Sequence, residues 1–256
     1  MTARGRPCDR YSLMQNVLAI VFCVWYNCGK GLVVRLKENK AYLYRFIRFV
    51  CAPLFRFVYR PKIIGKENIP SVGSAVVAGN HKHALDPILI DISTRRIVRT
   101  LAKKELHDGV FGFVFRGVGS IPVDLRSSQN RAALAAAVDA LNEGYIINVS
   151  PEAKRNYTDE LLLPFKFGAV SMAKKTGAPI VPYAIAGDYK LFSKNLTVIF
   201  GEPFYVGDTE LYDANRELYD RILELMIRAT DKAVLERKHI TSFDEWSKQN
   251  EQTPSS

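Results

Sequence analysis

The stretch Ala75-Val-Val-Ala-Gly-Asn-His-Lys-His-Ala-Leu-Asp-Pro-Ile-Leu-Ile-Asp91 decides the fold. Its apolar start, residues 75–78, predicts a buried strand that ends at Gly79-Asn80. Asp86-Pro87 is typical of a helix start, with the aspartate expected at the N-cap and the proline at the first helical position. The stretch therefore predicts a strand, a short loop and a helix in succession.

Two histidines, His81 and His83, lie in the loop of this stretch, at the sheet edge where open α/β folds usually bind their ligands. One turn of chain can bring the His81 imidazole to the Asp86 carboxylate. A carboxylate on one ring nitrogen leaves the other nitrogen as a general base. Asp-Pro also occurs for capping alone, and most loop histidines have no catalytic role. From these residues alone, both the catalytic and the structural interpretation stay open.

The charge of the chain is concentrated near its N-terminus. The 256 residues suit one large α/β domain, with or without an appendage, and carry a net charge of +10. Residues 1–66 contain thirteen Lys or Arg and two acids, so this part carries +11 and the remainder −1. Such a basic segment indicates an acidic partner, either an anionic membrane surface or an acidic protein. We expect no nucleic-acid partner.

The cysteines indicate neither a metal site nor a disulfide framework. All four lie in the N-terminal quarter, and their spacing matches no zinc site. We expect them to be small apolar residues with free thiols in a reducing compartment. They are Cys8, Cys23, Cys28 and Cys51.

An uncharged, mostly apolar run occupies residues 12–28, between Arg10 and Lys30. Its seventeen residues are at the lower limit for crossing a bilayer, and Gln15 and Asn16 weaken it further. No small-residue cleavage site follows, so the run is not typical of a signal peptide. We expect an embedded or re-entrant helix rather than a full span.

A second helix is predicted over residues 41–60, with apolar and basic residues on opposite faces and Pro53 kinking its middle. This pattern is typical of a helix that lies in an anionic membrane surface, and the alternative is a surface helix packed on its own domain. The predicted apolar face contains Leu43, Phe46, Ile47, Val50, Leu54, Phe57 and Val58, and the basic face Arg45, Arg48, Arg56 and Arg60.

Strands and helices alternate from about residue 73 to 237, with further strands expected at 97–101, 145–149, 178–183 and 196–200. This alternation predicts an α/β fold with a largely parallel sheet covered by helices, preceded by an N-terminal membrane-associated helical pair. We place a membrane-associating segment at 1–62, the α/β domain at 63–245 and a flexible tail at 246–256.

Polar side chains gather at or near four predicted strand ends. A site rich in Lys and Arg suits a substrate that bears phosphate, and a histidine base beside it suits deprotonation of a hydroxyl that attacks an activated carbonyl. The glycines have the wrong spacing for a dinucleotide or P-loop site, and no Ser or Cys nucleophile occupies a recognisable elbow. The four clusters are His81 with Asp86, Lys103 with Lys104, Asp124 with Arg126, and Glu152 with Lys154 and Arg155.

The order of these motifs resembles that of the 1-acylglycerol-3-phosphate acyltransferases and their glycerolipid acyltransferase relatives, over about residues 64–205. His81-Lys-His-Ala-Leu-Asp86 matches the first motif of that family, histidine, four residues and aspartate. Three later segments resemble the family's second, third and fourth motifs, and Lys103 matches a lysine segment. These segments are Gly119-Ser-Ile-Pro-Val-Asp-Leu-Arg126, Ser150-Pro-Glu-Ala-Lys-Arg155 and Ala178-Pro-Ile-Val-Pro182.

The resemblance implies an enzyme that moves an acyl group from acyl-CoA or acyl-carrier protein to the sn-2 hydroxyl of lysophosphatidate, giving phosphatidate without a cofactor or metal. His81 would be the base, oriented by Asp86. The expected location is the cytoplasmic face of the cell membrane. The expected substrate-binding residues are Lys103, Arg126, Glu152, Lys154, Arg155 and Pro182.

The third motif departs from the family pattern, because Ala153 and Lys154 replace the usual glycine and threonine. If the backbone at residue 153 has a positive φ, alanine is strained there. The change leaves two alternatives open. One is a different acceptor, namely glycerol 3-phosphate, a lysophospholipid or a lyso-ornithine lipid, and the other is a lipid-binding protein without turnover.

Overall fold

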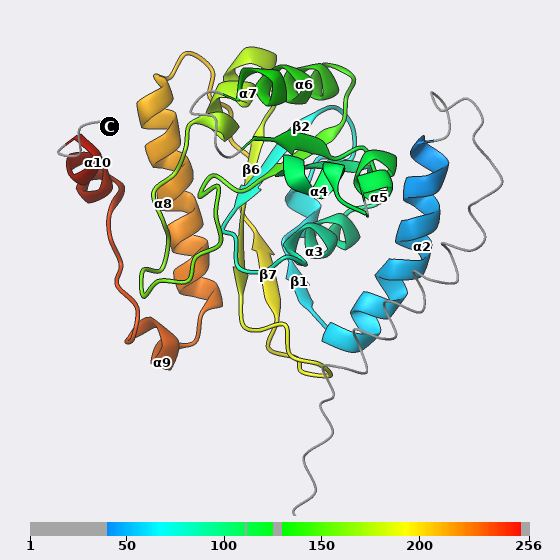
Figure 1. Cartoon of the computed structure of the whole chain (residues 1–256). Helices are drawn as coiled ribbons and strands as arrows, with labels where there is room; N and C mark the ends of the chain where they lie inside the picture. Colours follow the sequence, from blue (N-terminus) through cyan, green and yellow to red (C-terminus); the bar gives the residue numbers. More distant parts are fainter. Residues whose placement is uncertain (1–39, 111, 125–129, 252–256) are drawn as a thin grey trace, which may run out of the picture. The chain divides into compact units, whose positions relative to one another are not determined.

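The computed structural model describes residues 40–110, 112–124 and 130–251, and within them seven strands form one sheet in the order β1-β7-β6-β2-β5-β3-β4 (Figure 1). The strands are β1 (Lys62–Ile64), β2 (Ala75–Gly79), β3 (Val98–Lys103), β4 (Ile121–Val123), β5 (Ile146–Val149), β6 (Ile180–Ala186) and β7 (Thr197–Phe200). The pairs are parallel except β6 with β7, which is antiparallel. The prediction of a largely parallel sheet is confirmed.

Helices cover both faces of this sheet (Figure 1). One face packs against α6 (Arg131–Asn142), α7 (Gly168–Thr176) and α8 (Leu211–Ala229). The other side carries α2 (Lys40–Tyr59), α3 (Asp86–Ser93), α4 (Lys104–Asp108) and α5 (Gly112–Gly117). The five residues of β2 are all buried, as expected for a central strand covered on both faces. The carboxyl ends of β2 and β5 are therefore neighbours at one sheet edge.

Helix α2 runs unbroken through Pro53 and carries apolar side chains on more than one side. Among the α2 side chains that the structure describes, Tyr44, Phe55 and Tyr59 are buried, whereas Phe46 and Phe57, which belong to the predicted apolar face, are 54% and 63% exposed. Aromatic side chains occur on both sides of this helix, so one side packs on the domain and the other, with Phe46 and Phe57 of the predicted apolar face, is exposed. The residues that pack inward are those that meet α3 and the β6–β7 loop.

Two of the four arginines on the predicted basic face of α2 bond to the chain's own domain. Arg48 Nη1 donates to the carbonyl oxygen of Arg96 at 3.0 Å, and Arg56 Nη2 donates to that of Ile92 at 2.7 Å. Tyr44 on the same helix donates to the Asp91 carboxylate. Because α3 and the loop after it end in carbonyl groups that need donors, these long cationic side chains bond to their own domain.

The described residues 40–251 belong to one compact unit, so the boundary that we placed at residue 62 falls inside it. Helix α10 (Phe243–Glu251) extends into the expected tail, where Trp246 Nε1 donates to the Tyr219 hydroxyl at 3.1 Å. The short helix α9 (Lys232–Leu235) precedes it. The apolar run at 12–28 lies outside the described residues. Within the described part of the chain, no helix has the length and apolar character that crossing a membrane requires.

Candidate active site

The turn after β2 is fixed to the neighbouring strand β6. Asn80 Nδ2 donates to the carbonyl oxygen of Ile185 at 3.0 Å, and the Ile185 amide donates back to Asn80 Oδ1 at 2.8 Å. Gly79 lies so close to Tyr183 that any side chain at position 79 would collide with its ring. These contacts fix the backbone at Gly79 and Asn80. The next residue, His81, is therefore attached to a rigid segment of chain.

The predicted histidine–aspartate pair forms in this turn. His81 Nδ1 lies 2.8 Å from Asp86 Oδ2, and the backbone amides of Lys82 and His83 donate to the same oxygen at 2.7 and 2.8 Å. Asp86 is 2% exposed, so three donors surround a buried carboxylate. The N-cap of α3 is Leu85, without a side-chain cap, so the prediction of Asp86 as N-cap is wrong. Its carboxylate instead binds back across the loop to His81.

The second oxygen of Asp86 has a partner that the sequence did not indicate. The Tyr189 hydroxyl, from the loop between β6 and β7, donates to Asp86 Oδ1 at 2.6 Å. Both carboxylate oxygens are therefore engaged, and the carboxylate cannot rotate freely.

Glu152, after β5, connects two backbone segments. The His81 amide donates to Glu152 Oε1 at 2.8 Å, and the Leu163 amide donates to Oε2 at 3.0 Å. Glu152 is 3% exposed, and both of its carboxylate oxygens accept hydrogen bonds from backbone amides. Burial raises the pKa of Glu152 to about 7, against the lowering effect of the two amides and of His81. Glu152 therefore connects the backbone at His81 to the backbone at Leu163 and fixes the start of the histidine turn.

This pKa gives a testable dependence of stability on pH. Between about pH 4.5, the ordinary pKa, and about 7, the folded protein binds a proton at Glu152 more tightly than the unfolded chain does. The contribution of Glu152 to stability is thus full below pH 4.5 and falls as pH rises to 7. Urea denaturation across this range is expected to show a steeper fall for the wild type than for Glu152→Gln. Exposed Glu236→Gln is the control, and equal slopes in all three proteins would contradict the assignment.

The backbone at Ala153 has φ of +57°, in the left-handed region. Alanine is therefore strained at this position, as expected from the sequence for a positive φ. A glycine would adopt this conformation without strain, whereas alanine costs about 1 kcal/mol. The loop nevertheless keeps its contact with the histidine turn, because the Asn156 amide donates to the carbonyl oxygen of His81 at 3.1 Å.

The predicted cationic residues occupy different places. Lys154 and Arg155 are exposed in the loop after β5, where Arg155 Nη1 donates to the Tyr157 hydroxyl at 3.0 Å. Burial lowers the pKa of His83, the Asp86 charge opposes this, and Arg155 lowers it further. Arg155 is thus close enough to act electrostatically on the histidine turn.

The other predicted substrate-binding residues are less close to the dyad. Lys103 is exposed at the end of β3, with β5 between it and β2. Pro182 is buried inside β6, beside Ala78 of β2. Arg126 lies outside the described residues.

Comparisons with known proteins agree with these motifs. A family model described as Acyltransferase matches residues 60–186. The 1-acyl-sn-glycerol-3-phosphate acyltransferase of Bacillus subtilis is 31% identical over 153 residues, which cover 57% of this chain and 75% of that protein. This chain belongs to the acyltransferase family. The Borreliella burgdorferi protein of the same name is 32% identical, over 59% of this chain and 61% of its own length.

A solved structure shares the fold of this chain. The crystal structure of the 1-acyl-sn-glycerophosphate acyltransferase from Thermotoga maritima resembles this structure with a TM-score of 0.64, covering 85% of this chain and 92% of that chain. At 23% identity, this likeness shows the shared fold alone.

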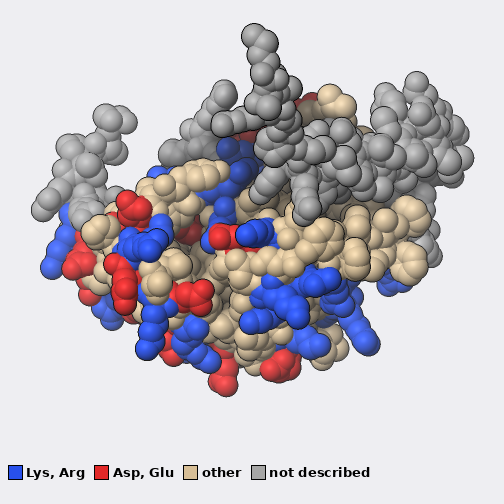
Figure 2. Space-filling view, turned by 90° about the horizontal axis from the view of Figure 1, so that it is seen from below, with Lys and Arg blue, Asp and Glu red and all other residues tan. Residues whose placement is uncertain are grey.

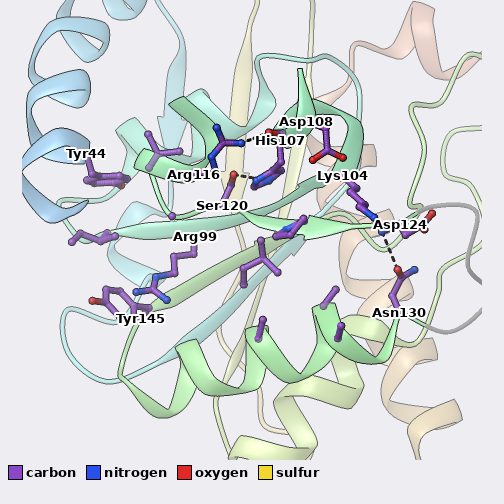
Figure 3. A pocket seen from close by; sticks show the side chains of 18 residues that line it. Tyr44, Arg99, Lys104, His107, Asp108, Arg116, Ser120, Asp124, Asn130 and Tyr145 are labelled. Atoms are coloured by element: carbon purple, nitrogen blue, oxygen red, sulfur yellow. Dashed lines mark hydrogen bonds between the residues drawn. The ribbon is translucent and has the colours of Figure 1, made fainter. Parts of the chain in front are cut away.

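A cavity of about 700 Å³ in this acyltransferase-family chain lies beside β3, β4 and α6, and no residue of the histidine turn lines it (Figure 3). At one end, Arg99 stacks over the Tyr145 ring, with Cζ 3.7 Å from its centroid. The other end carries Lys104, Asp124 and Asn130 (Figure 3). The His81–Asp86 pair and this cavity are therefore separate features of the described residues.

Proposed function

We propose that this chain transfers an acyl group from acyl-CoA or acyl-carrier protein to the sn-2 hydroxyl of lysophosphatidate, giving phosphatidate. The observation that carries the proposal is the 2.8 Å contact between His81 Nδ1 and Asp86 Oδ2 at the carboxyl end of β2. The names of the relatives in Bacillus subtilis and Borreliella burgdorferi support the choice of acceptor. The chemistry needs no cofactor, because a thioester is already an activated acyl group.

In the proposed reaction, His81 keeps its Nδ1 proton on the bond to Asp86 and uses Nε2 as the base. Nε2 takes the proton of the acceptor hydroxyl as its oxygen attacks the thioester carbonyl. The C–S bond then breaks, and the leaving thiolate takes the proton from the imidazolium. The Asp86 carboxylate stabilises the transient imidazolium charge, and the acyl group passes directly from donor to acceptor without a covalent enzyme intermediate.

Acyl transfer to phosphatidate is tested with the purified full chain, radiolabelled lysophosphatidate in vesicles, and each donor in turn. Phosphatidate formation with either donor is expected. If glycerol 3-phosphate, a lysophospholipid or a lyso-ornithine lipid is acylated faster than lysophosphatidate, the proposed acceptor is wrong and the proposed mechanism still holds. Binding to vesicles without any acylated product would favour the non-catalytic alternative.

Arg126 and Arg155 are proposed to bind the acceptor phosphate, supported by Lys103 and Lys154. Losing a hydrogen bond to a charged group costs about 1.5–3 kcal/mol, so Arg155→Ala is expected to raise the acceptor KM by roughly 10- to 150-fold. Steady-state kinetics with lysophosphatidate measure this, and Arg228→Ala, an exposed arginine on α8, is the matched control. An unchanged acceptor KM in Arg155→Ala would remove the assignment of Arg155 to the acceptor phosphate.

We also propose that α2 holds the enzyme on an anionic membrane, on the cytoplasmic face. Three of its phenylalanines point to solvent, with Phe46, Phe49 and Phe57 54%, 78% and 63% exposed. Lys and Arg side chains gather beside a band of uncharged surface on the face seen in Figure 2. Aromatic side chains flanked by basic ones suit the boundary between headgroups and acyl chains.

A further inference from the structure

The loop between β6 and β7 touches both the dyad and helix α2. Gly187, with φ of +77°, begins this loop so close to the backbone of Asn195 that a side chain there would collide with it. Further on, the Phe192 amide donates to the carbonyl oxygen of Val58 at 2.7 Å, on α2. Between these points lies Tyr189, whose hydroxyl reaches Asp86.

The ring of Tyr189 is held by aromatic contacts from two directions. It stacks on His83, with centroids 4.5 Å apart and planes 24° apart. On α2, Tyr59 and Phe55 meet it edge to face, at centroid distances of 5.7 and 6.3 Å. Such ring pairs prefer fixed geometries. The position of the Tyr189 hydroxyl therefore depends on the packing of α2.

The hydroxyl can act only as a donor to Asp86. Burial and the adjacent Asp86 charge raise the pKa of Tyr189 far above its ordinary value, so the phenol keeps its proton. Asp86 Oδ2 already receives the His81 ring and two amides, whereas Oδ1 receives Tyr189. Without this bond, the buried Oδ1 loses a donor, and the carboxylate can tilt against the donors on Oδ2 and shift its alignment with the His81 ring.

We infer that Tyr189 is a positioning residue for the His81–Asp86 pair and that it couples the packing of helix α2 to the orientation of the base. The inference rests on the proposed function of His81 as the base. The Tyr189 ring and its hydrogen bond to Asp86 would then link helix α2, which is proposed to contact the membrane, to the His81–Asp86 pair. It follows that disturbing α2 on its inner face changes turnover rather than acceptor binding.

The decisive variant is Tyr189→Phe, which keeps the ring contacts and removes only the hydroxyl. A general base contributes about 100- to 10,000-fold, and loss of its alignment is expected to lower kcat about tenfold with unchanged acceptor KM. Tyr219→Phe is the matched control, since its buried hydroxyl donates to the carbonyl oxygen of Thr241 at 2.6 Å, away from the dyad. Its kcat is expected to stay at the wild-type value.

A double-mutant cycle tests the coupling to α2. Phe55→Leu is expected to lower kcat about threefold in the wild type and to have no further effect in the Tyr189→Phe background. Effects that simply multiply would overturn the coupling, and an unchanged kcat in Tyr189→Phe would overturn the positioning role.

A spectroscopic measurement separates this inference from the proposed reaction. The NMR signal of the His81 Nδ1 proton, identified by its loss in His81→Ala, is expected to shift in Tyr189→Phe and to stay in place in Tyr219→Phe. If the wild type makes no acylated product while this shift occurs, the proposed function fails and the positioning of the pair stands. An unmoved signal in Tyr189→Phe overturns the inference regardless of turnover.

Discussion

Replacing His81 with alanine is expected to lower kcat for acyl transfer about a thousandfold, because a general base typically contributes 100- to 10,000-fold. The fold should survive this change. The imidazole is 27% exposed, and after its removal Asp86 still receives the amides of Lys82 and His83 and the hydroxyl of Tyr189. The buried carboxylate therefore keeps three of its four donors. Kinetics and a thermal melt of the same preparation measure both parts of the expectation.

His83 supplies the control for this experiment within the same turn. Its backbone amide donates to Asp86 and survives any side-chain replacement, whereas its ring stacks on Tyr189 and accepts from the Leu85 amide. His83→Ala should therefore reduce kcat only mildly. If His83→Ala were inactive and His81→Ala active, the base would be the wrong histidine and the proposed mechanism would fall.

The sequence predicted the His81–Asp86 pair well because its geometry is local. Five positions of chain and one turn bring the two side chains together, and a pattern of residue types at fixed spacing can express that. The strand before the loop and the helix after it are likewise set by apolar runs and by Asp86-Pro87. The N-cap role of Asp86 was wrong, because its carboxylate accepts from the His81 ring and from the amides of Lys82 and His83 across the loop.

The residues around the pair could not be predicted in the same way, because long-range contacts place them. Glu152 lies 71 positions from His81, and Tyr189 lies 103 positions from Asp86. Glu152 was recognised from its motif, but nothing in that motif says that its oxygens bind backbone amides. A tyrosine in a predicted loop carries no signal of a catalytic neighbour. Only the pairing of β2 with β5 and β6 brings these loops together.

Helix α2 shows a limit of periodicity. Its spacing fits both a membrane-surface helix and a helix packed on its own domain, and the structure has features of each. Tyr44, Phe55 and Tyr59 pack inward, and three other aromatic residues remain outside. Because α2 carries aromatic residues all around, sequence alone could not assign which of them meet the protein. This division also decides which substitutions can test membrane binding.

The second large effect is expected when Phe46, Phe49 and Phe57 are replaced together by serine. Inserting an exposed phenylalanine into the acyl boundary gains about 1–2 kcal/mol, so losing three should weaken binding to anionic vesicles roughly 100- to 10,000-fold. Replacing the exposed arginines Arg45 and Arg60 with glutamine should weaken it only about thirtyfold, since each basic residue near such a surface contributes about 1 kcal/mol. Added salt should weaken binding of the wild type and of the phenylalanine variant, and have less effect on the arginine variant. Arg48 and Arg56 are left intact, because they bond to carbonyl groups of their own domain.

In the matched control, serine replaces Ile227, Val234 and Ile240, three apolar residues that are also exposed. They lie on or beside α8 and α9, on the opposite side of the described unit from α2 (Figure 1). Sedimentation with anionic vesicles compares the wild type, the phenylalanine variant, the arginine variant and this control, which should pellet like the wild type. The phenylalanine variant should keep its dyad and still acylate lysophosphatidate dispersed in detergent, while working slowly on vesicle-borne acceptor. If it pellets as completely as the wild type, the membrane contact lies elsewhere. The outward aromatic residues of α2 would then serve another purpose, and the helix would be bound only to its own domain through Tyr44, Phe55 and Tyr59.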